Sequence, residues 1–132
     1  MDINEFKDTL EYQDFIKENN GIGYLRIRAY GASEAIPIEG MNIVVSTIYN
    51  DKNIIFFEGV TDESGMIKRL ELPAPSREKD DLVIPKWKVY NIEATYDGKV
   101  ENFKVNIYDD ICVQQVINTT YDNLVRGYFY GG

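Results

Sequence analysis

The sequence contains no histidine and a single cysteine, and these two absences exclude several kinds of chemistry. Serine–histidine and cysteine–histidine systems are impossible, because imidazole is the base that activates the nucleophile in both. A zinc site would have to combine Cys112 with carboxylates, which is an unusual ligand set. An intrachain disulfide is also excluded, and the apolar neighbours of Cys112 predict that it packs as a small hydrophobic side chain. We therefore expect no catalytic residue, no metal and no cofactor.

The chain also lacks any apolar run near the roughly 20 residues of a membrane-spanning helix, so no membrane contact is expected. It begins with MDINEFKDTLEYQDF, which has neither the basic start nor the apolar stretch of a secretory signal. We expect synthesis in the cytoplasm without export by the general route. Release within a virion-like particle and deposition on a spore or cell envelope both stay open.

Basic residues are the minority among the charges: 14 Lys and Arg stand against 22 Asp and Glu, for a formal charge of −8. An acidic surface repels phosphate backbones, so nucleic acid is not an expected partner. Acidity by itself also keeps a protein soluble. The 132 residues are the usual length of one domain with one hydrophobic core.

The acidic residues form no obvious catalytic or metal-binding constellation. Asp80-Asp81 and Asp109-Asp110 are adjacent pairs, and neighbouring residues on extended backbone point to opposite faces, so solvated turns are expected. The stretch from Asp62 to Gly65 carries oxygen donors, as calcium loops do, but it lacks the alternating ligands and the distal glutamate. It predicts a β-turn with Gly65 at positive φ.

The first 20 residues predict helical structure. Asp2 followed by Glu5 is typical of a capping box, and Asn19 to Gly21 is a stop signal. Either one helix or two short helices fits this pattern. Apolar residues recur between these signals at helical spacing: Ile3, Phe6, Leu10, Phe15 and Ile16.

After Gly21 the apolar period changes from about 3.6 to 2, which indicates strands. Turn signals separate seven predicted strands, and Asp97-Gly98 is the strongest hairpin signal. The pattern predicts a mainly β protein, a seven-stranded β-sandwich with a short N-terminal helical segment. In its first strand Leu25, Ile27 and Ala29 should face the core, and Arg26 and Arg28 should face away. The predicted strands are 24–30, 42–49, 54–60, 66–72, 87–96, 100–107 and 111–118.

We divide the chain into a helical segment (1–20), a sandwich (21–120) and an aromatic tail (121–132). The polar loop 73–85 is expected to be the most mobile part. Ten tyrosines are many for this length, and tyrosine is enriched at interfaces. Large aromatics are unusual at a chain end, which is more often polar. We therefore predict docking through the tail and, second, through the helical segment. The predicted partner-binding residues are Tyr128, Phe129, Tyr130, Phe6 and Leu10.

Several stretches together resemble a known family. YQDFIKENNGIGYLRIRAY (12–30), AIPIEGMNIVVS (35–46), FFEGVTDESG (56–65), LELPAP (70–75) and YNIEATYDGKVENFKVNIYDD (90–110) are similar to one module. That module is the transthyretin-like, carboxypeptidase-regulatory-type domain near the start of clostridial spore cortex-lytic pro-enzymes, also present in phage-associated proteins. The resemblance covers about residues 12–118. It implies an accessory β-sandwich without catalytic residues, hydrolysis being the task of a separate domain.

The leading expectation is a non-catalytic structural subunit that docks with other protein subunits in an oligomeric bacterial or phage-tail-like assembly. Two alternatives stay open. One is a module that binds cell-wall glycan, since β-sandwiches often present aromatic platforms to sugars. The other is a regulator that, like a pro-segment, holds a spore cortex hydrolase. The fold alone does not choose among them.

Overall fold

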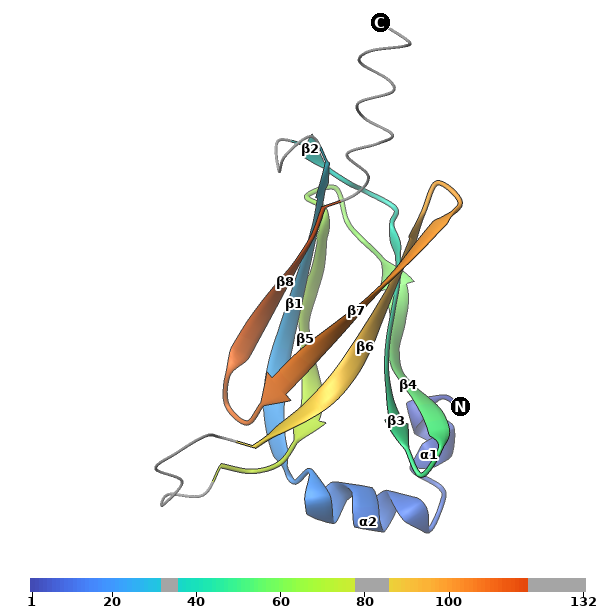
Figure 1. Ribbon diagram of the computed structural model, residues 1–132, viewed down its shortest axis with the longest axis vertical. Coiled ribbons are helices and arrows are strands. Elements are labelled where there is room, and N and C mark those ends of the chain that lie inside the picture. Colours follow the sequence, from blue (N-terminus) through green and yellow to red (C-terminus); the bar gives the residue numbers. More distant parts are fainter. Residues whose placement is uncertain (32–35, 78–85, 119–132) are drawn as a thin grey trace, which may run out of the picture.

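The computed structural model describes residues 1–31, 36–77 and 86–118 (Figure 1). In these ranges two short helices, α1 (Ile3–Phe6) and α2 (Glu11–Glu18), precede eight strands. Seven of these strands correspond to the predicted ones. The eighth, β2, lies in a segment that was predicted to be a plain connection. The strands are β1 (Gly21–Gly31), β2 (Ile36–Pro37), β3 (Asn42–Tyr49), β4 (Lys52–Val60), β5 (Met66–Ala74), β6 (Trp87–Tyr96), β7 (Lys99–Tyr108) and β8 (Cys112–Asn118).

The strands form two sheets that pack face to face as a β-sandwich, which confirms the predicted fold class (Figure 1). One sheet has the order β4-β3-β6-β7, with antiparallel neighbours throughout. In the other sheet β1 is central: β5 pairs with it in antiparallel fashion, β8 pairs with it in parallel, and β2 joins its end. Each sheet therefore has an outer face that does not contribute to the core.

Alternation along β1 divides its side chains between the core and the outer face. Leu25, Ile27 and Ala29 are fully buried, whereas Arg26 is exposed and Arg28 is partly buried, as the sequence predicted. Burying each large aliphatic side chain contributes about 1.5–3 kcal/mol. The buried face of β1 packs in one cluster with residues of the opposite sheet, among them Ile43 and Ile92.

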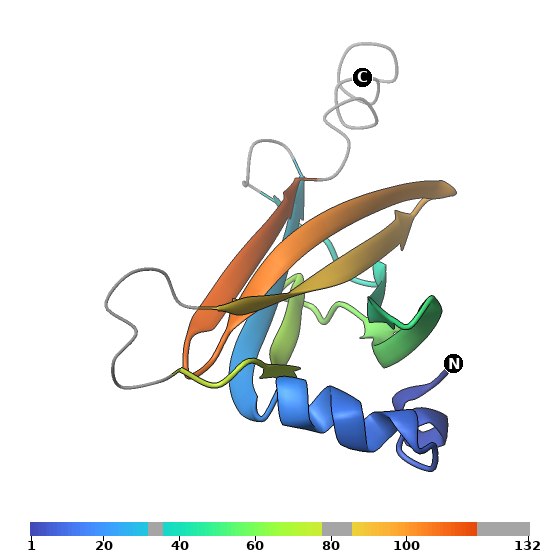
Figure 2. The same cartoon turned by 60° about the horizontal axis from the view of Figure 1, so that its bottom comes forward.

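The N-terminal segment forms two helices, one of the two arrangements that the sequence allowed. The Asp2 carboxylate caps α1 by accepting a hydrogen bond of 3.1 Å from the backbone N–H of Asn4. Figure 2 shows α2 lying across one end of the sandwich. There Phe6 and Phe15 form a second, small core with Ile54, and both rings meet the Tyr49 ring edge-on.

Polar contacts also join this segment to the sandwich. The Met1 ammonium group donates to the Asn53 carbonyl oxygen at 2.9 Å, and the Ile55 amide donates to the Met1 carbonyl oxygen at 2.7 Å. Glu11 of α2 forms an ion pair with Lys52, at the start of β4. The N-terminal residues thus lie along β4, at the edge of its sheet. No helix in the described ranges has the length and apolarity needed to cross a membrane.

The hairpin turns have the backbone that their sequences predicted. Asp97 and Gly98 both have positive φ, at 52° and 76°, as a type I′ turn requires. Gly65 also has positive φ, at 74°, in the turn before β5. The Asp62 carboxylate closes that turn by accepting hydrogen bonds from the Ser64 and Met66 amides.

One packing prediction from the sequence is wrong. Cys112 is exposed and does not pack as a small hydrophobic side chain. It is in register with Tyr24, so strict alternation puts it on the outer face of its sheet while the next residue, Val113, faces inward. The polar loop begins after Ala74, where β5 ends, and residues 78–85 lie outside the described part of the chain.

Candidate binding sites

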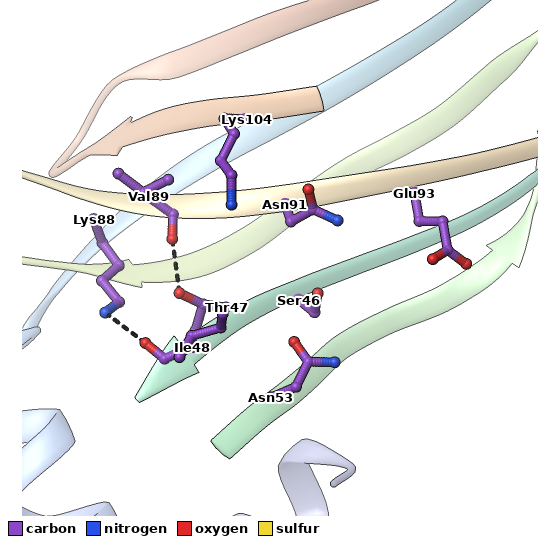
Figure 3. A pocket seen from close by; sticks show the side chains of 9 residues that line it. All are labelled: Ser46, Thr47, Ile48, Asn53, Lys88, Val89, Asn91, Glu93 and Lys104. Carbon is purple, nitrogen blue, oxygen red and sulfur yellow. Dashed lines mark hydrogen bonds between the residues drawn. The ribbon is translucent and has the colours of Figure 1, made fainter. Parts of the chain in front are cut away.

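A polar pocket lies on the outer face of the β4-β3-β6-β7 sheet (Figure 3). Its centre is a row across three strands, in which Ser46 of β3 is in register with Asn91 of β6, and Asn91 with Lys104 of β7. Glu93 is two residues further along β6, on the same face. The pocket has a volume of about 360 Å³.

Ser46 forms the floor of this pocket. Its side chain is shorter than those of Asn53, Asn91 and Glu93, which lie around it in Figure 3. Ser46 is only 5% exposed, and its hydroxyl has no hydrogen-bond partner within the described ranges. A small residue among longer neighbours creates a hollow in the sheet face, and here the hollow has a polar floor.

The two ionised side chains in the middle of the pocket are of opposite sign. Glu93 and Lys104 are both exposed, and they form no ion pair with each other. The Asn91 amide group is oriented by its donation to Asn102 Oδ1 at 3.1 Å. The Asn91 Oδ1 atom is therefore presented as an acceptor beside the two charges.

One end of the pocket is fixed by two further hydrogen bonds (Figure 3). The Thr47 hydroxyl donates to the Val89 carbonyl oxygen at 2.7 Å, and Lys88 Nζ donates to the Ile48 carbonyl oxygen at 3.3 Å. Burial lowers the pKa of Lys88. Its ammonium group also lies 5.9 Å from the centre of the Phe15 ring, so Lys88 connects the pocket to the helical segment.

The other sheet carries a surface of different character, which we call the arginine–tyrosine surface. It comprises Tyr24, Arg26, Arg28 and Tyr30 of β1, and Arg69 of β5. Alternation puts the four β1 residues on the outer face, because Leu25, Ile27 and Ala29 occupy the core face. Three of the five arginines in the sequence thus lie on one face of an acidic protein.

Cation–π contacts order this surface. The Arg69 guanidinium lies 4.3 Å from the centre of the Tyr24 ring, and the Arg28 guanidinium 5.0 Å from that of Tyr30. The Arg28 Nε atom is buried and has no hydrogen-bond partner in the described part of the chain. Glu71, in register with Tyr24, is an acidic neighbour. The surface therefore presents arginine donors held against aromatic rings.

A third candidate site is a more apolar pocket of about 450 Å³ between the helical segment and strands β1, β4 and β5. Ile3, Tyr12 and Ile16 line it from the helical side, and Phe56 of β4 and Leu72 of β5 line it from the strands. Asn19 lies at its margin, with its side-chain amide donating to the Phe15 carbonyl oxygen at 3.0 Å. Its lining belongs largely to the packing that attaches the helices.

The predicted partner-binding residues have different environments. Phe6 is fully buried within the chain, so its ring is not available to a partner in this conformation. Leu10, between the two helices, is 92% exposed. Tyr128, Phe129 and Tyr130 lie outside the described residues.

The predicted solvated turns include Asp109, whose carboxylate joins two segments. It accepts hydrogen bonds from the Ile22 amide at 3.1 Å and the Arg77 amide at 2.9 Å. In the described ranges no group of three or more Cys, Asp or Glu side chains is positioned to hold a metal ion. Asp80 and Asp81 are outside these ranges.

The sequence analysis missed the pocket and found part of the arginine–tyrosine surface. A short polar residue in the β-branched strand Asn42–Tyr49 was a signal for Ser46. Its neighbours Asn91 and Lys104 could not be found without the register of three strands. The alternation of Arg26 and Arg28 was visible, but the approach of Arg69 to Tyr24 depends on the pairing of β1 with β5.

No family model and no curated protein matches the sequence. Solved structures that are similar include 5-hydroxyisourate hydrolase from Klebsiella pneumoniae, with 13% identity and a TM-score of 0.46 over 74% of this chain and 91% of that one. Transthyretin from Sparus aurata has 16% identity and a TM-score of 0.44 over 72% of this chain and 90% of that one. One is named as an enzyme, and neither similarity assigns a function to this chain. Its fold class rests on the two sheets described above.

Proposed function

We propose that this chain is a non-catalytic subunit that docks with other protein subunits, including further copies of itself, in a larger bacterial or phage-tail-like assembly. The observation that carries the proposal is the arginine–tyrosine surface. Arginine and tyrosine are enriched at protein interfaces and among the residues that dominate binding energy. Here both residue types gather on the outer face of one sheet.

The cation–π contacts favour binding for an entropic reason. A mobile arginine loses side-chain freedom when it binds a partner, at about 0.5–1.5 kcal/mol for each immobilised side chain. Arg69 and Arg28 already lie against Tyr24 and Tyr30 in the free chain, so part of this ordering precedes binding. Guanidinium groups pair with carboxylates in bidentate fashion, and the formal charge of −8 makes a second copy a source of carboxylates.

The terminal tail belongs to the same proposal. Tyr128, Phe129 and Tyr130 are large aromatics close to three glycines, and ordering the six residues from Gly127 opposes most of what burying the rings would gain. A neighbouring subunit that adds a groove or a sheet edge would shift that balance. The tail and the arginine–tyrosine surface are therefore separate contributors that can be tested one at a time.

The test is self-association of the purified full-length chain, measured by sedimentation equilibrium. We expect the double variant Arg26→Glu and Arg69→Glu to weaken association at least tenfold. The matched control is Lys86→Glu with Lys99→Glu, which makes the same charge change away from this surface and should leave association within about twofold. Deletion of residues 127–132 should leave the unfolding midpoint nearly unchanged and weaken association at least tenfold. Association unaffected by either change would contradict the proposal.

A further inference from the structure

We propose that the pocket floored by Ser46 binds a small zwitterion of the α-amino-acid class, with an ammonium group and a carboxylate on one compact scaffold. The pocket lies on the β4-β3-β6-β7 sheet, and the arginine–tyrosine surface lies on the other sheet. The inference therefore does not depend on the docking function. Three observations support it: the buried floor, the pair of separated charges and the size of the hollow.

The buried floor offers a polar atom to a ligand. Ser46 is only 5% exposed as a residue, and its hydroxyl has no hydrogen-bond partner within the described ranges. Arg28 Nε, and not this hydroxyl, is the side-chain atom in those ranges that is both buried and unpartnered, so the Ser46 hydroxyl reaches the solvent in the hollow. A polar atom of a ligand there can accept or donate a hydrogen bond in place of water. An alanine or valine in this position would fill the strand without offering that hydrogen bond.

The separated charges indicate a ligand that carries both signs. Lys104 is in register with Asn91, and Glu93 is the next residue of β6 on that face, so the two charged residues are diagonal neighbours. Diagonal positions on adjacent strands are about 7–8 Å apart, and these two side chains form no ion pair. A ligand between them can bring its ammonium group to Glu93 and Asn91 Oδ1, and its carboxylate to Lys104 and the Ser46 hydroxyl. A cation would pair with Glu93 alone and an anion with Lys104 alone, so either ion would leave the opposite charge of the pocket without a partner.

The size of the hollow restricts the ligand. A volume of about 360 Å³ is near the lower end of the usual range for ligand pockets, about 300–1,000 Å³. An extended glycan chain is larger, and the lining contains no aromatic ring on which a sugar could stack. A single amino acid, or the zwitterion glycylglycine, fits both the size and the charge pattern.

The experiment is a titration of the full-length chain followed by amide chemical shifts in NMR spectra. The probes are the twenty common amino acids and glycylglycine, each to 20 mM (a range chosen to detect about millimolar affinity), beside acetate, ethylammonium and N-acetylglucosamine. At least one zwitterion should shift the amides of Ser46, Asn91 and Lys104 with a saturable curve. Acetate and ethylammonium should bind at least tenfold more weakly.

Four variants locate the site. Glu93→Gln and Lys104→Gln should each weaken binding at least tenfold, and Ser46→Val should abolish it by filling the hollow. Ser46→Ala, which removes the hydroxyl and leaves the space, should give an intermediate loss. Glu101→Gln and Lys99→Gln are the controls, because they make the same charge changes outside the lining and should bind normally.

Three results would overturn the inference. The first is no saturable shift with any of the zwitterions. The second is zwitterion binding that Ser46→Val and Glu93→Gln leave intact, which would put the site elsewhere. The third is saturable binding of N-acetylglucosamine with none of the amino acids, which would make the pocket a glycan site. The NMR spectrum of each variant must be that of a folded protein before its titration is interpreted. Ser46→Ala is the variant that disturbs the strand least.

Discussion

Gly65 combines a positive φ with a close approach to the backbone of a neighbouring strand. Its φ is +74°, and a Cβ atom there would lie 2.4 Å from the Ala29 carbonyl oxygen. Gly98 provides a matched control, because its φ is +76° and a Cβ atom would meet no heavy atom within 4 Å. The two glycines have nearly the same φ in different surroundings.

We expect Gly98→Ala to destabilise the fold by about 1–2 kcal/mol, the usual penalty for an L-residue in the left-handed region. Gly65→Ala should add about 1–3 kcal/mol to that figure, because the turn must move away from β1 to relieve the contact. Urea unfolding of the two variants measures the difference. Equal midpoints would show that the turn before β5 can shift at no cost.

Single residues also show where prediction from sequence succeeds and fails. Leu25 and Arg26 were assigned to the correct faces, because strand alternation is a local rule. Cys112 was predicted to be buried because its neighbours are apolar. It is exposed, because the alternation of side chains along β8 puts it on the outer face of the sheet. Ser46 was missed, because a pocket on a sheet face exists only once the register of three strands is known.

At the scale of elements, the helical segment is attached by an aromatic cluster. Phe6 is fully buried, and its ring packs edge-on against Phe15 and Tyr49 at centroid distances of 5.5 and 6.1 Å. Phe6→Ala should therefore cost about 3–5 kcal/mol. Leu10→Ala should stay within about 0.5 kcal/mol, because Leu10 is 92% exposed.

Chemical denaturation of these two variants measures the stability contrast, and the association assay described above tests Leu10 as a docking residue. If Phe6→Ala proved nearly neutral, the helices would contribute little to the stability of the sandwich. The buried position of Phe6 could not be read from helical spacing. Helical spacing of apolar residues shows that one side of a helix packs against an apolar surface. It does not show whether that surface belongs to the core of the same chain or to a partner protein.

The contact between α2 and β4 predicts a pH dependence. Hydrogen bonds from Lys52 and then Asn50 hold the pKa of Glu11 below its ordinary value of 4.5. A folded-state pKa that is lowered adds stability above the unfolded-state value, and this stability is lost as the pH falls through the folded-state pKa. The effect is small, because Glu11 is at the surface.

Unfolding midpoints should therefore show that wild type is more stable than Glu11→Gln at neutral pH, and that the two converge as the pH falls below 4.5. Glu63→Gln, on the exposed turn before β5, is the control and should follow wild type across the range. A difference between wild type and Glu11→Gln that stayed constant with pH would show that the carboxylate charge has no role in attaching α2.

Strand boundaries were easier to predict than strand partners. Turn chemistry located the hairpin at Asp97-Gly98 and the ends of seven strands to within a few residues, because glycine and aspartate act locally. The two-residue strand β2 (Ile36–Pro37) is too short to produce an alternating pattern. The parallel pairing of β1 with β8 joins distant segments, and no local signal reports it.

At the scale of the whole molecule, the charge distribution separates the two sheets. The chain is acidic overall, yet the outer face of the β1 sheet carries Arg26, Arg28 and Arg69. The outer face of the other sheet has a pocket with charges of both signs. The molecule therefore offers two surfaces of different chemistry on opposite sides of one core, so one partner need not exclude the other.

The central position of β1 has a consequence for the order of events during synthesis. This strand leaves the ribosome well before its parallel partner β8, and the contact between Ile22 and Asp109 spans 87 residues. Closing such long loops is slow, and domains dominated by distant pairings typically fold in milliseconds to seconds. Until β8 emerges, one edge of β1 is bare, and an unpaired edge is where strands of other nascent chains can add. The step most exposed to aggregation is thus the interval before β8 is synthesised.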